Sequence, residues 1–301
     1  MPLWRPSLGP DDWIPLLRQF HSKAAKPLVS LSDGSVEVFR EHAFRPAVPA
    51  ILPKGSLHNL PAVSRWFERD RENGEIWRFN TSYLSPFGKT MVPVEVTQSN
   101  KLPSGDLETK FLQQEAHLTD FIEWCEMQAP GPNGTDQRDP GTIRLYLAQA
   151  SLSDLPGTLR KDLPTPGIVE SAGRGDVYNS NIWIGMAPTD TPLHKDPNPN
   201  LFVQLAGRKV VRLYEPSVGM EMFRAAQMRT HDTASASFRG AEMMQGEEKK
   251  ALEDIVWGND AENPLEAHLN SGDAIFIPRG WWHSIKGVGK GLTASVNWWF
   301  R

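Results

Sequence analysis

Short stretches of β-branched and aromatic residues recur along the second half of the chain, from residue 142 onward. Glycine- and proline-containing turns separate them, and Ala206-Gly207-Arg208 predicts a tight hairpin turn. Many short strands joined in this way are typical of a β-sandwich or a β-barrel. The predicted strands cover residues 143–147, 181–186, 201–205, 209–214, 274–277, 282–285 and 292–299.

The first half of the chain has a different pattern. Apolar residues at helical spacing predict helices within residues 62–77 and 107–128, and acidic residues before Trp13 predict a capped helix start at 11–17. Residues 36–39 have the alternation of a strand, and residues 129–141 form a polar, turn-rich loop.

A long polar segment divides the predicted strands. Residues 217–270 favour helix, notably over 241–257, and an insert of this size could cover the mouth of a site or form a dimer contact. We therefore expect N-terminal elements over residues 1–140 that pack on a β core over residues 141–301, with the insert at 217–270.

Composition excludes several classes of protein. The net charge of −4 argues against general binding to nucleic acid. The single cysteine, Cys125, can form neither an intrachain disulfide nor a cysteine-based zinc site, and we expect it to be buried. No stretch reaches the ~20 apolar residues of a membrane span, and the first residues lack the apolar core of a signal peptide. We expect no membrane association and an intracellular location, cytoplasmic or nuclear.

Candidate metal ligands occur in Thr191-Pro192-Leu193-His194-Lys195-Asp196. In an extended strand, residues two apart point to the same side, so His194 and Asp196 project together. His283 follows far along the chain, on a strand that a rolled sheet can bring beside them. Two imidazoles and one carboxylate form the facial triad of non-haem iron(II) oxygenases, which leaves three metal positions for reactants. His-x-Asp alone is weak support, because most such pairs are incidental.

Two further strands carry polar residues that a β core must accommodate. Alternation places Lys209 on one face with Val211 and Leu213, and a lysine inside a barrel needs an anion beside it. The alternative is a lysine that extends to solvent from the start of its strand. In the last strand, Thr293, Ser295, Asn297 and Trp299 share one face, which predicts contact with either water or a ligand.

These motifs together resemble the JmjC, or cupin-like, oxygenases. The stretch from Thr191 to Lys209 resembles the core of that family, and Gly272-Asp273-Ala274-Ile275-Phe276-Ile277-Pro278 with Trp281-Trp282-His283 is similar to its second metal motif. Ser295-Val296-Asn297-Trp298-Trp299-Phe300 resembles the closing strand, and Arg144-Leu145-Tyr146-Leu147 the strand that supplies a tyrosine. The likeness is greatest to small JmjC hydroxylases, including the asparaginyl hydroxylase that inhibits hypoxia-inducible factor and the arginyl-hydroxylase type.

The resemblance implies a fold and a set of roles. The fold is mainly β with flanking helices, built on a double-stranded β-helix (jelly-roll, cupin-like) core. His194, Asp196 and His283 would bind Fe(II), and Lys209 would pair with the distal carboxylate of the cosubstrate 2-oxoglutarate. Tyr146 and Thr191 would donate hydrogen bonds to that carboxylate, and Asn200 and Asn297 would lie beside the oxoglutarate or the metal. With dioxygen, such a site hydroxylates a C–H bond, which we expect to belong to a protein side chain.

Other functions stay open. The same chemistry on an N-methyl group of lysine or arginine gives demethylation, and the substrate could be a small molecule. The absence of a reader domain or a Cys/His zinc module favours a hydroxylase over a chromatin-bound demethylase. A cupin that holds zinc or manganese for hydrolysis or isomerisation would fit if Lys209, Tyr146 and Thr191 pointed away from the metal. An inactive binding module is a third alternative, against which the presence of all three metal ligands counts. A homodimer is also open.

Overall fold

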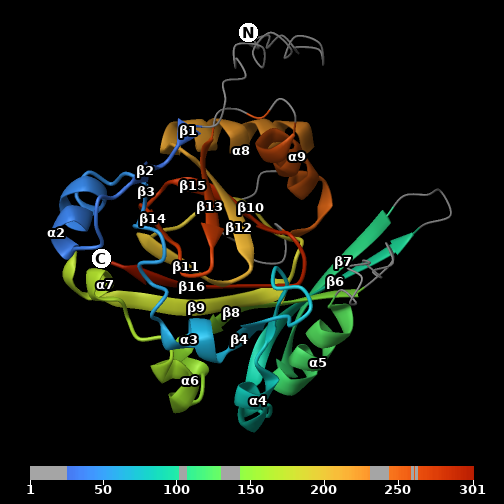
Figure 1. Cartoon of the computed structure of the whole chain (residues 1–301). Helices are drawn as coiled ribbons and strands as arrows, with labels where there is room; N and C mark the ends of the chain where they lie inside the picture. The colour runs from blue at the N-terminus through green and yellow to red at the C-terminus, as the bar shows by residue number, and fades with distance from the viewer. Residues whose placement is uncertain (1–25, 102–106, 130–142, 231–243, 259–260, 262–263) are drawn as a thin grey trace, which may run out of the picture.

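The computed structural model describes residues 26–101, 107–129, 143–230, 244–258, 261 and 264–301. Strands in these residues form two large sheets, and helices lie around the outside (Figure 1). Apolar side chains from both sheets meet between them, among them Phe202 and Ile275 from the larger sheet and Val211 and Ile285 from the smaller. This shared interior contains a cavity, which residues of both sheets line, among them Phe202 and Ile285.

The larger sheet has nine strands, in the order β2 (Val29–Ser30), β3 (Ala50–Ile51), β14 (Ala274–Ile277), β11 (Asn200–Ala206), β16 (Leu292–Phe300), β9 (Val177–Met186), β8 (Ile143–Ser151), β6 (Met91–Lys101) and β7 (Leu107–His117). The smaller has five, in the order β1 (Lys26–Pro27), β13 (Leu265–Asn270), β12 (Arg208–Tyr214), β15 (Trp282–Val288) and β10 (Thr189–Lys195). Strands β9 to β16 pass back and forth between the sheets, as in a jelly roll. The predicted fold class is confirmed.

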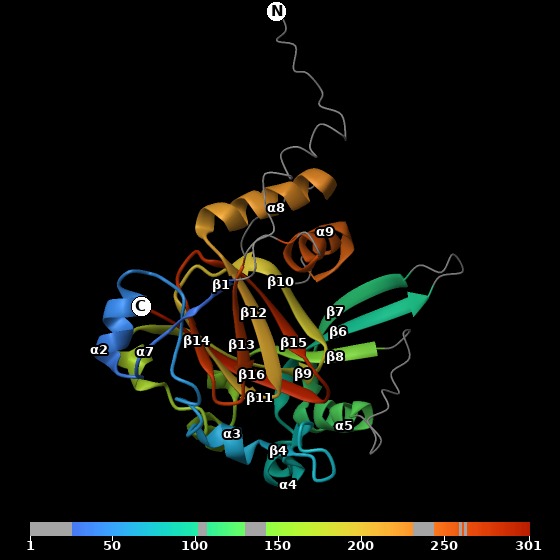
Figure 2. The same cartoon turned by 45° about the horizontal axis from the view of Figure 1, so that its top comes forward.

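Helices cover both sheets on their outer sides. The larger sheet carries α2 (Val36–Phe39) with a π-helical turn (Arg40–Phe44), α3 (Pro61–Arg65), α4 (Thr81–Leu84), α5 (Leu118–Gln128), α6 (Gly157–Lys161) and α7 (Gly167–Ser171), with short 3-10 turns at Ser85–Phe87 and Leu152–Asp154. The smaller carries α8 (Pro216–Thr230) and α9 (Gly246–Trp257), which lie together over it (Figure 2). Because apolar layers cover both faces of β11, all seven of its residues are buried.

The seven predicted strands all occur, with ends shifted by a few residues, whereas parts of the first half were predicted wrongly. Residues 107–117 form strand β7 rather than a helix, because they pair with β6 along their whole length. Residues 62–77 contain most of the short helix α3, followed by a hairpin of β4 (Phe67–Arg69) and β5 (Trp77–Phe79). Residues 36–39 form helix α2 instead of a strand, with the Ser35 hydroxyl accepting from Val38 N at 3.3 Å.

The remaining predictions about the fold have different outcomes. Cys125 is buried in α5, as expected. The segments at residues 11–17 and 130–141 lie outside the described residues, and the division of the chain near residue 140 stays a prediction. The last part of the 217–270 segment forms β13, which pairs with β12, so this end of the expected insert belongs to the barrel.

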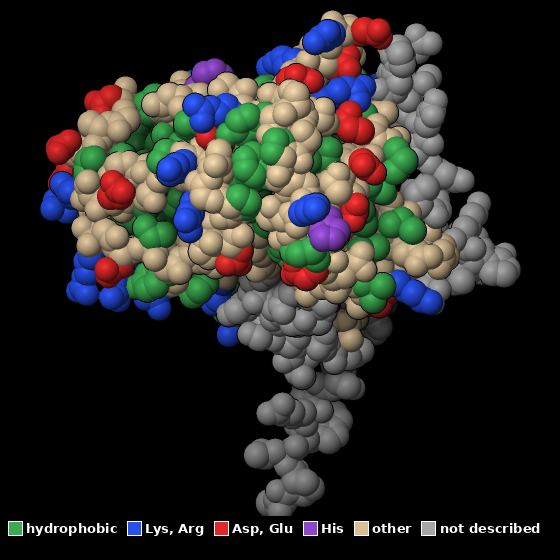
Figure 3. All heavy atoms as spheres, turned by 90° about the horizontal axis from the view of Figure 1, so that it is seen from below, with side chains coloured by type: hydrophobic (Ala, Val, Ile, Leu, Met, Phe, Trp, Pro, Cys, Tyr) green, Lys and Arg blue, Asp and Glu red, His purple; other side chains and the backbone are tan. Residues whose placement is uncertain are grey.

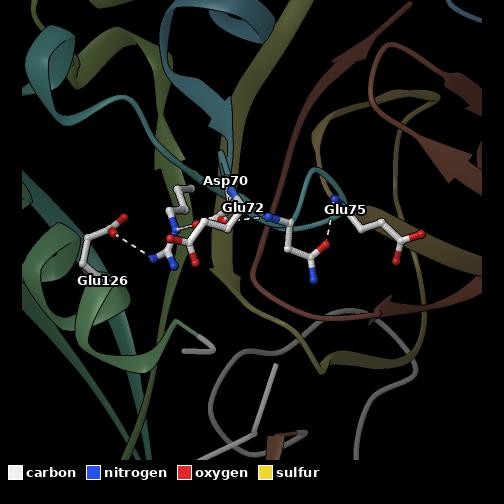
Figure 4. A network of polar contacts seen from close by, with 6 residues as sticks. Asp70, Glu72, Glu75 and Glu126 are labelled. Carbon is white, nitrogen blue, oxygen red and sulfur yellow. Dashed lines mark hydrogen bonds and ion pairs between the residues drawn. The ribbon is translucent and has the colours of Figure 1, made fainter. Parts of the chain in front are cut away.

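The β4–β5 hairpin is fixed to α5 by a polar network (Figure 4). Arg78 Nε donates to Asp70 Oδ2 at 2.5 Å, and Arg78 Nη1 reaches Glu126 Oε2 of α5 at 3.2 Å. The other Asp70 oxygen accepts the backbone N–H groups of Glu72 and Asn73, which closes the turn. The carboxylates of Asp70 and Glu126 therefore have a structural role.

On the face seen in Figure 3, side chains of both charges are interspersed with hydrophobic ones. Among the helices of the described residues, none has the length and apolar character needed to cross a membrane.

Gly219 allows α8 to pack directly on Trp282 of β15. A Cβ at this position would lie 2.1 Å from Trp282 Cγ, which is far inside van der Waals contact. We expect Gly219→Ala to lower the free energy of unfolding by about 1–3 kcal/mol, because an overfilled site must move the helix or the indole. Urea unfolding measures this change.

Gly157→Ala in α6 is the matched control, since a Cβ there meets no atom within 4 Å. It should leave stability unchanged or raise it by up to about 1 kcal/mol, because alanine favours helix more than glycine does. Equal effects of the two substitutions would contradict the close packing of α8 on Trp282.

Candidate metal centre

Strands β10 and β15 place two histidines opposite each other. They are antiparallel neighbours in the smaller sheet, and His194 is the direct partner of His283. Between Thr191 and His194 the register shifts, so the side chains of both these residues line the cavity. Asp196 follows directly after β10, two residues beyond His194, as the strand alternation predicts.

The three side chains converge on one point. The two imidazole ring centres lie 4.1 Å apart, and His283 Nε2 lies 3.7 Å from Asp196 Oδ2. One ligand atom from each of the three residues lies within 4.8 Å of the other two. All three residues are buried, so a cation between them would be largely shielded from solvent.

Hydrogen bonds orient each of these side chains. His194 Nδ1 donates to Pro192 O at 2.8 Å, and His283 Nδ1 donates to Trp281 O at 3.2 Å. Because a carbonyl can only accept, the Nε2 atom of each neutral ring keeps its lone pair for a metal. Asn200 Nδ2 donates to Asp196 Oδ2 at 2.9 Å and holds the carboxylate in place.

The protonation states suit a divalent cation. Burial, and then the neighbouring His283, lower the pKa of His194 to about 4, so its ring is neutral at pH 7. Burial acts to raise the pKa of Asp196. The neighbouring histidines, together with hydrogen bonds from Trp299 and Asn200, outweigh it and hold this pKa below its usual value. The centre thus offers the carboxylate of Asp196 as an anionic donor and the ring of His194 as a neutral one.

Lys209 lines the same cavity and is 3 % exposed. Its Nζ donates to Ser295 Oγ at 2.7 Å and to Tyr146 OH at 3.3 Å, and it lies 5.3 Å from the centre of the Phe202 ring. Burial lowers the pKa of Lys209 to about 7. Among the described residues no carboxylate forms an ion pair with it, so the charged form of Lys209 has no anionic partner in this part of the chain.

The other predicted site residues are also brought together here. Tyr146, Thr191, Asn200 and Asn297 all line the cavity with the three candidate ligands. Gly185 makes room for the tyrosine, since a Cβ there would lie 2.3 Å from Tyr146 Cδ2. Asn297 Oδ1 accepts from Trp183 Nε1 at 2.9 Å, which fixes the amide on the cavity wall. Lys209, Tyr146 and Thr191 therefore do not point away from the candidate ligands.

Two hydrogen bonds at this site were not predicted from the sequence. Ser295 was placed on the polar face of the last strand, but only the fold brings its hydroxyl to Lys209. Trp299 lines the cavity and hydrogen-bonds Asp196, a contact that alternation within one strand cannot predict. The signal for both was the unexpected polar row opposite an apolar row in a buried strand.

Lys209 should make the stability of the metal-free protein depend on pH. Its folded-state pKa of about 7 lies below the ordinary 10.5, so between these values the unfolded chain binds a proton that the folded chain has released. Stability therefore rises with pH through this window, by about 1 kcal/mol per pH unit. Calorimetric melting from pH 7 to 10 should show a steeper rise for the wild type than for Lys209→Met, and parallel curves would contradict this account.

Comparison with known proteins agrees with the fold. The chain matches the cupin-like domain family over residues 35–301. It is 26 % identical over 278 residues to "Lysine-specific demethylase JMJ30" of Arabidopsis thaliana, covering 92 % of this chain and 56 % of the relative. It is 28 % identical over 271 residues to "Lysine-specific demethylase 8" of Danio rerio, covering 88 % and 56 %. "JmjC domain-containing protein F" of Dictyostelium discoideum is 25 % identical over 300 residues, covering 87 % and 59 %.

The chain spans about half the length of the curated relatives it matches. The greater likeness to the asparaginyl hydroxylase stays a prediction, since these relatives carry other names. The family match extends through both sheets and all three converging side chains. The chain therefore belongs to the cupin-like domain family, as a JmjC-type member.

Proposed function

We propose that this protein is an Fe(II)- and 2-oxoglutarate-dependent oxygenase that hydroxylates a C–H bond of a protein side chain. His194, Asp196 and His283 hold the iron, and Lys209 pairs with the distal carboxylate of 2-oxoglutarate. The observation that carries the proposal is one cavity with two complementary ends. One end offers three metal donors, and the other offers the buried amine of Lys209, beside which the described residues place no carboxylate.

The donor set fits the metal and the cosubstrate. Two imidazoles and one carboxylate suit iron(II) and leave three coordination positions for reactants. A dicarboxylic acid held at the metal through its 2-oxo acid end would present its second carboxylate to the part of the same cavity that Lys209 lines. There Lys209, Ser295 and Tyr146 offer one positive charge and hydroxyl donors. A hydrolytic zinc or manganese cupin has no need for this second end.

Bound iron(II), with 2-oxoglutarate and dioxygen, supplies oxidation of a C–H bond coupled to release of succinate and carbon dioxide. The residues of the chain itself orient the side chains of the site and shield the cavity from water. Asn200 fixes Asp196, and Asn297 is fixed by Trp183. Phe202 and Ile285 give the cavity apolar walls, which exclude water and strengthen the charge pairing at Lys209.

A second candidate is N-methyl-lysine demethylation, which the printed names of several relatives favour. The same C–H oxidation on an N-methyl group leads to loss of that carbon as formaldehyde. The metal and cosubstrate residues are shared by both reactions, so the products distinguish them.

The test is incubation of cell-extract proteins with the enzyme, iron(II) and 2-oxoglutarate, followed by peptide mass spectrometry. Hydroxylation predicts peptides heavier by one oxygen atom, whereas demethylation predicts loss of a methylene unit together with formaldehyde. Succinate formation must accompany either change. Product peptides that form equally well without 2-oxoglutarate would refute the oxygenase proposal.

A further inference from the structure

The candidate metal centre depends on a β-bulge in β10. Thr191 and His194 lie three positions apart in β10, while their partners on β15, Ile285 and His283, lie two positions apart. Residues three apart in a regular strand face opposite sides, so one of this pair would point away from the cavity. The extra residue in the bulge turns both side chains inward.

A bulge interrupts the backbone hydrogen bonds between two strands. Here side chains supply donors to the carbonyls of the bulge. Pro192, inside the bulge, has no N–H to donate. The carbonyl of Thr191 accepts from Ser284 Oγ at 2.8 Å, and the carbonyl of Pro192 accepts from His194 Nδ1 at 2.8 Å. Ser284 is 2 % exposed and faces the outside of the smaller sheet, between His283 and Ile285.

Helix α9 fixes the direction of the Ser284 hydroxyl. Trp257, the last residue of α9, donates from Nε1 to Ser284 Oγ at 2.9 Å. Because the hydroxyl oxygen accepts there, its own proton is directed to the Thr191 carbonyl. The bulge therefore accepts a hydrogen bond whose direction is fixed by α9, which lies outside the barrel.

Several contacts hold α9 in this place beside β10 and β15 (Figure 2). The Arg212 guanidinium lies 4.3 Å and the Lys286 ammonium 4.6 Å from the centre of the Trp257 ring. Lys249 of α9 pairs with Asp190 of β10 at 2.9 Å, and Glu253 pairs with Lys286 of β15. The helix is therefore tied to both strands that carry the two histidines.

We propose that α9 is a brace for the metal centre, in which Trp257 and Ser284 are positioning residues that hold the β10 bulge and so keep Thr191 and His194 turned into the cavity. This inference rests on the proposed function, because it concerns the same metal. The proposal assigns a structural role to the segment between β12 and β13. Neither residue touches the metal or the reactants; each acts through the backbone of β10.

Cobalt(II) titration of the full chain tests the brace, since the visible absorption of bound cobalt reports ligand geometry without turnover. Trp257→Phe keeps an aromatic ring under Arg212 and Lys286 but removes the N–H, and Ser284→Ala removes the hydroxyl. Both should weaken cobalt binding about tenfold, within the range for residues that orient metal ligands, and should change the absorption band.

Trp66→Phe is the matched control. Trp66 is buried in the core behind the larger sheet, and its Nε1 donates to Asp162 Oδ2 at 2.9 Å, so an equivalent hydrogen bond is lost far from the bulge. It should bind cobalt as the wild type does. Cobalt binding by Trp257→Phe that equals either the wild type or Trp66→Phe would overturn the brace. Failure of the wild type to bind cobalt would instead overturn the proposed function.

Discussion

Replacement of Asp196 by alanine should abolish succinate formation from 2-oxoglutarate. The substitution leaves two imidazoles and removes the one carboxylate of the three converging side chains. The loss should exceed the roughly 10–100-fold expected for a residue that only orients a ligand. Asn200→Ala, which removes the hydrogen bond to Asp196 Oδ2, should fall within that smaller range. Succinate measured with saturating iron(II) separates the two variants.

Asp176→Ala is the control for Asp196→Ala. Asp176 is an exposed aspartate that pairs with Arg301 at 2.9 Å, so its loss should leave turnover unchanged. Full activity of Asp196→Ala would mean that the three converging side chains do not hold the catalytic metal.

Replacement of Lys209 by methionine should raise the KM for 2-oxoglutarate by roughly 30-fold or more. Loss of one partner of a buried charge pair costs about 2 kcal/mol or more, since the other charge is left without compensation. Methionine has a similar length and no charge, so the cavity walls should stay in place. Initial rates at varied 2-oxoglutarate give the KM.

Lys161→Met, on the exposed surface of α6, is the control for this change and should leave the KM as it is. An unchanged KM in Lys209→Met would return the site to the alternative of a metal-binding cupin with another chemistry.

Much of the β core could be predicted because the alternation of side chains along a strand is a local pattern. His194 and Asp196 share a face through strand alternation alone. The same alternation placed Lys209 on one face with Val211, whereas its position inside the barrel and not at the solvent came from the family resemblance. The pairing of β10 with β15, which brings His283 to the centre, came only from the family resemblance, since nothing in either strand specifies its distant partner.

The elements that were predicted wrongly or missed also have physical explanations. Residues 107–117 carry apolar residues at helical spacing, but pairing with β6 outweighs that local preference, and Leu112 is left exposed. β13 was missed although Leu265, Ala267 and Leu269 alternate with polar residues, because the polar segment before it masked the change of pattern. The bulge between Thr191 and His194 has no signal that alternation could detect, since it exists only against β15.

The central claim is that one cavity binds iron(II) at His194, Asp196 and His283 and 2-oxoglutarate between that metal and Lys209. Chelation of iron(II) by a 2-oxo acid produces a visible charge-transfer band, so anaerobic titration with both tests the claim without a substrate. The account predicts a saturable band at one iron per chain, lost in Asp196→Ala and shifted to much higher 2-oxoglutarate concentration in Lys209→Met. A wild-type protein that develops no such band, or one equally strong in Asp196→Ala, would contradict it.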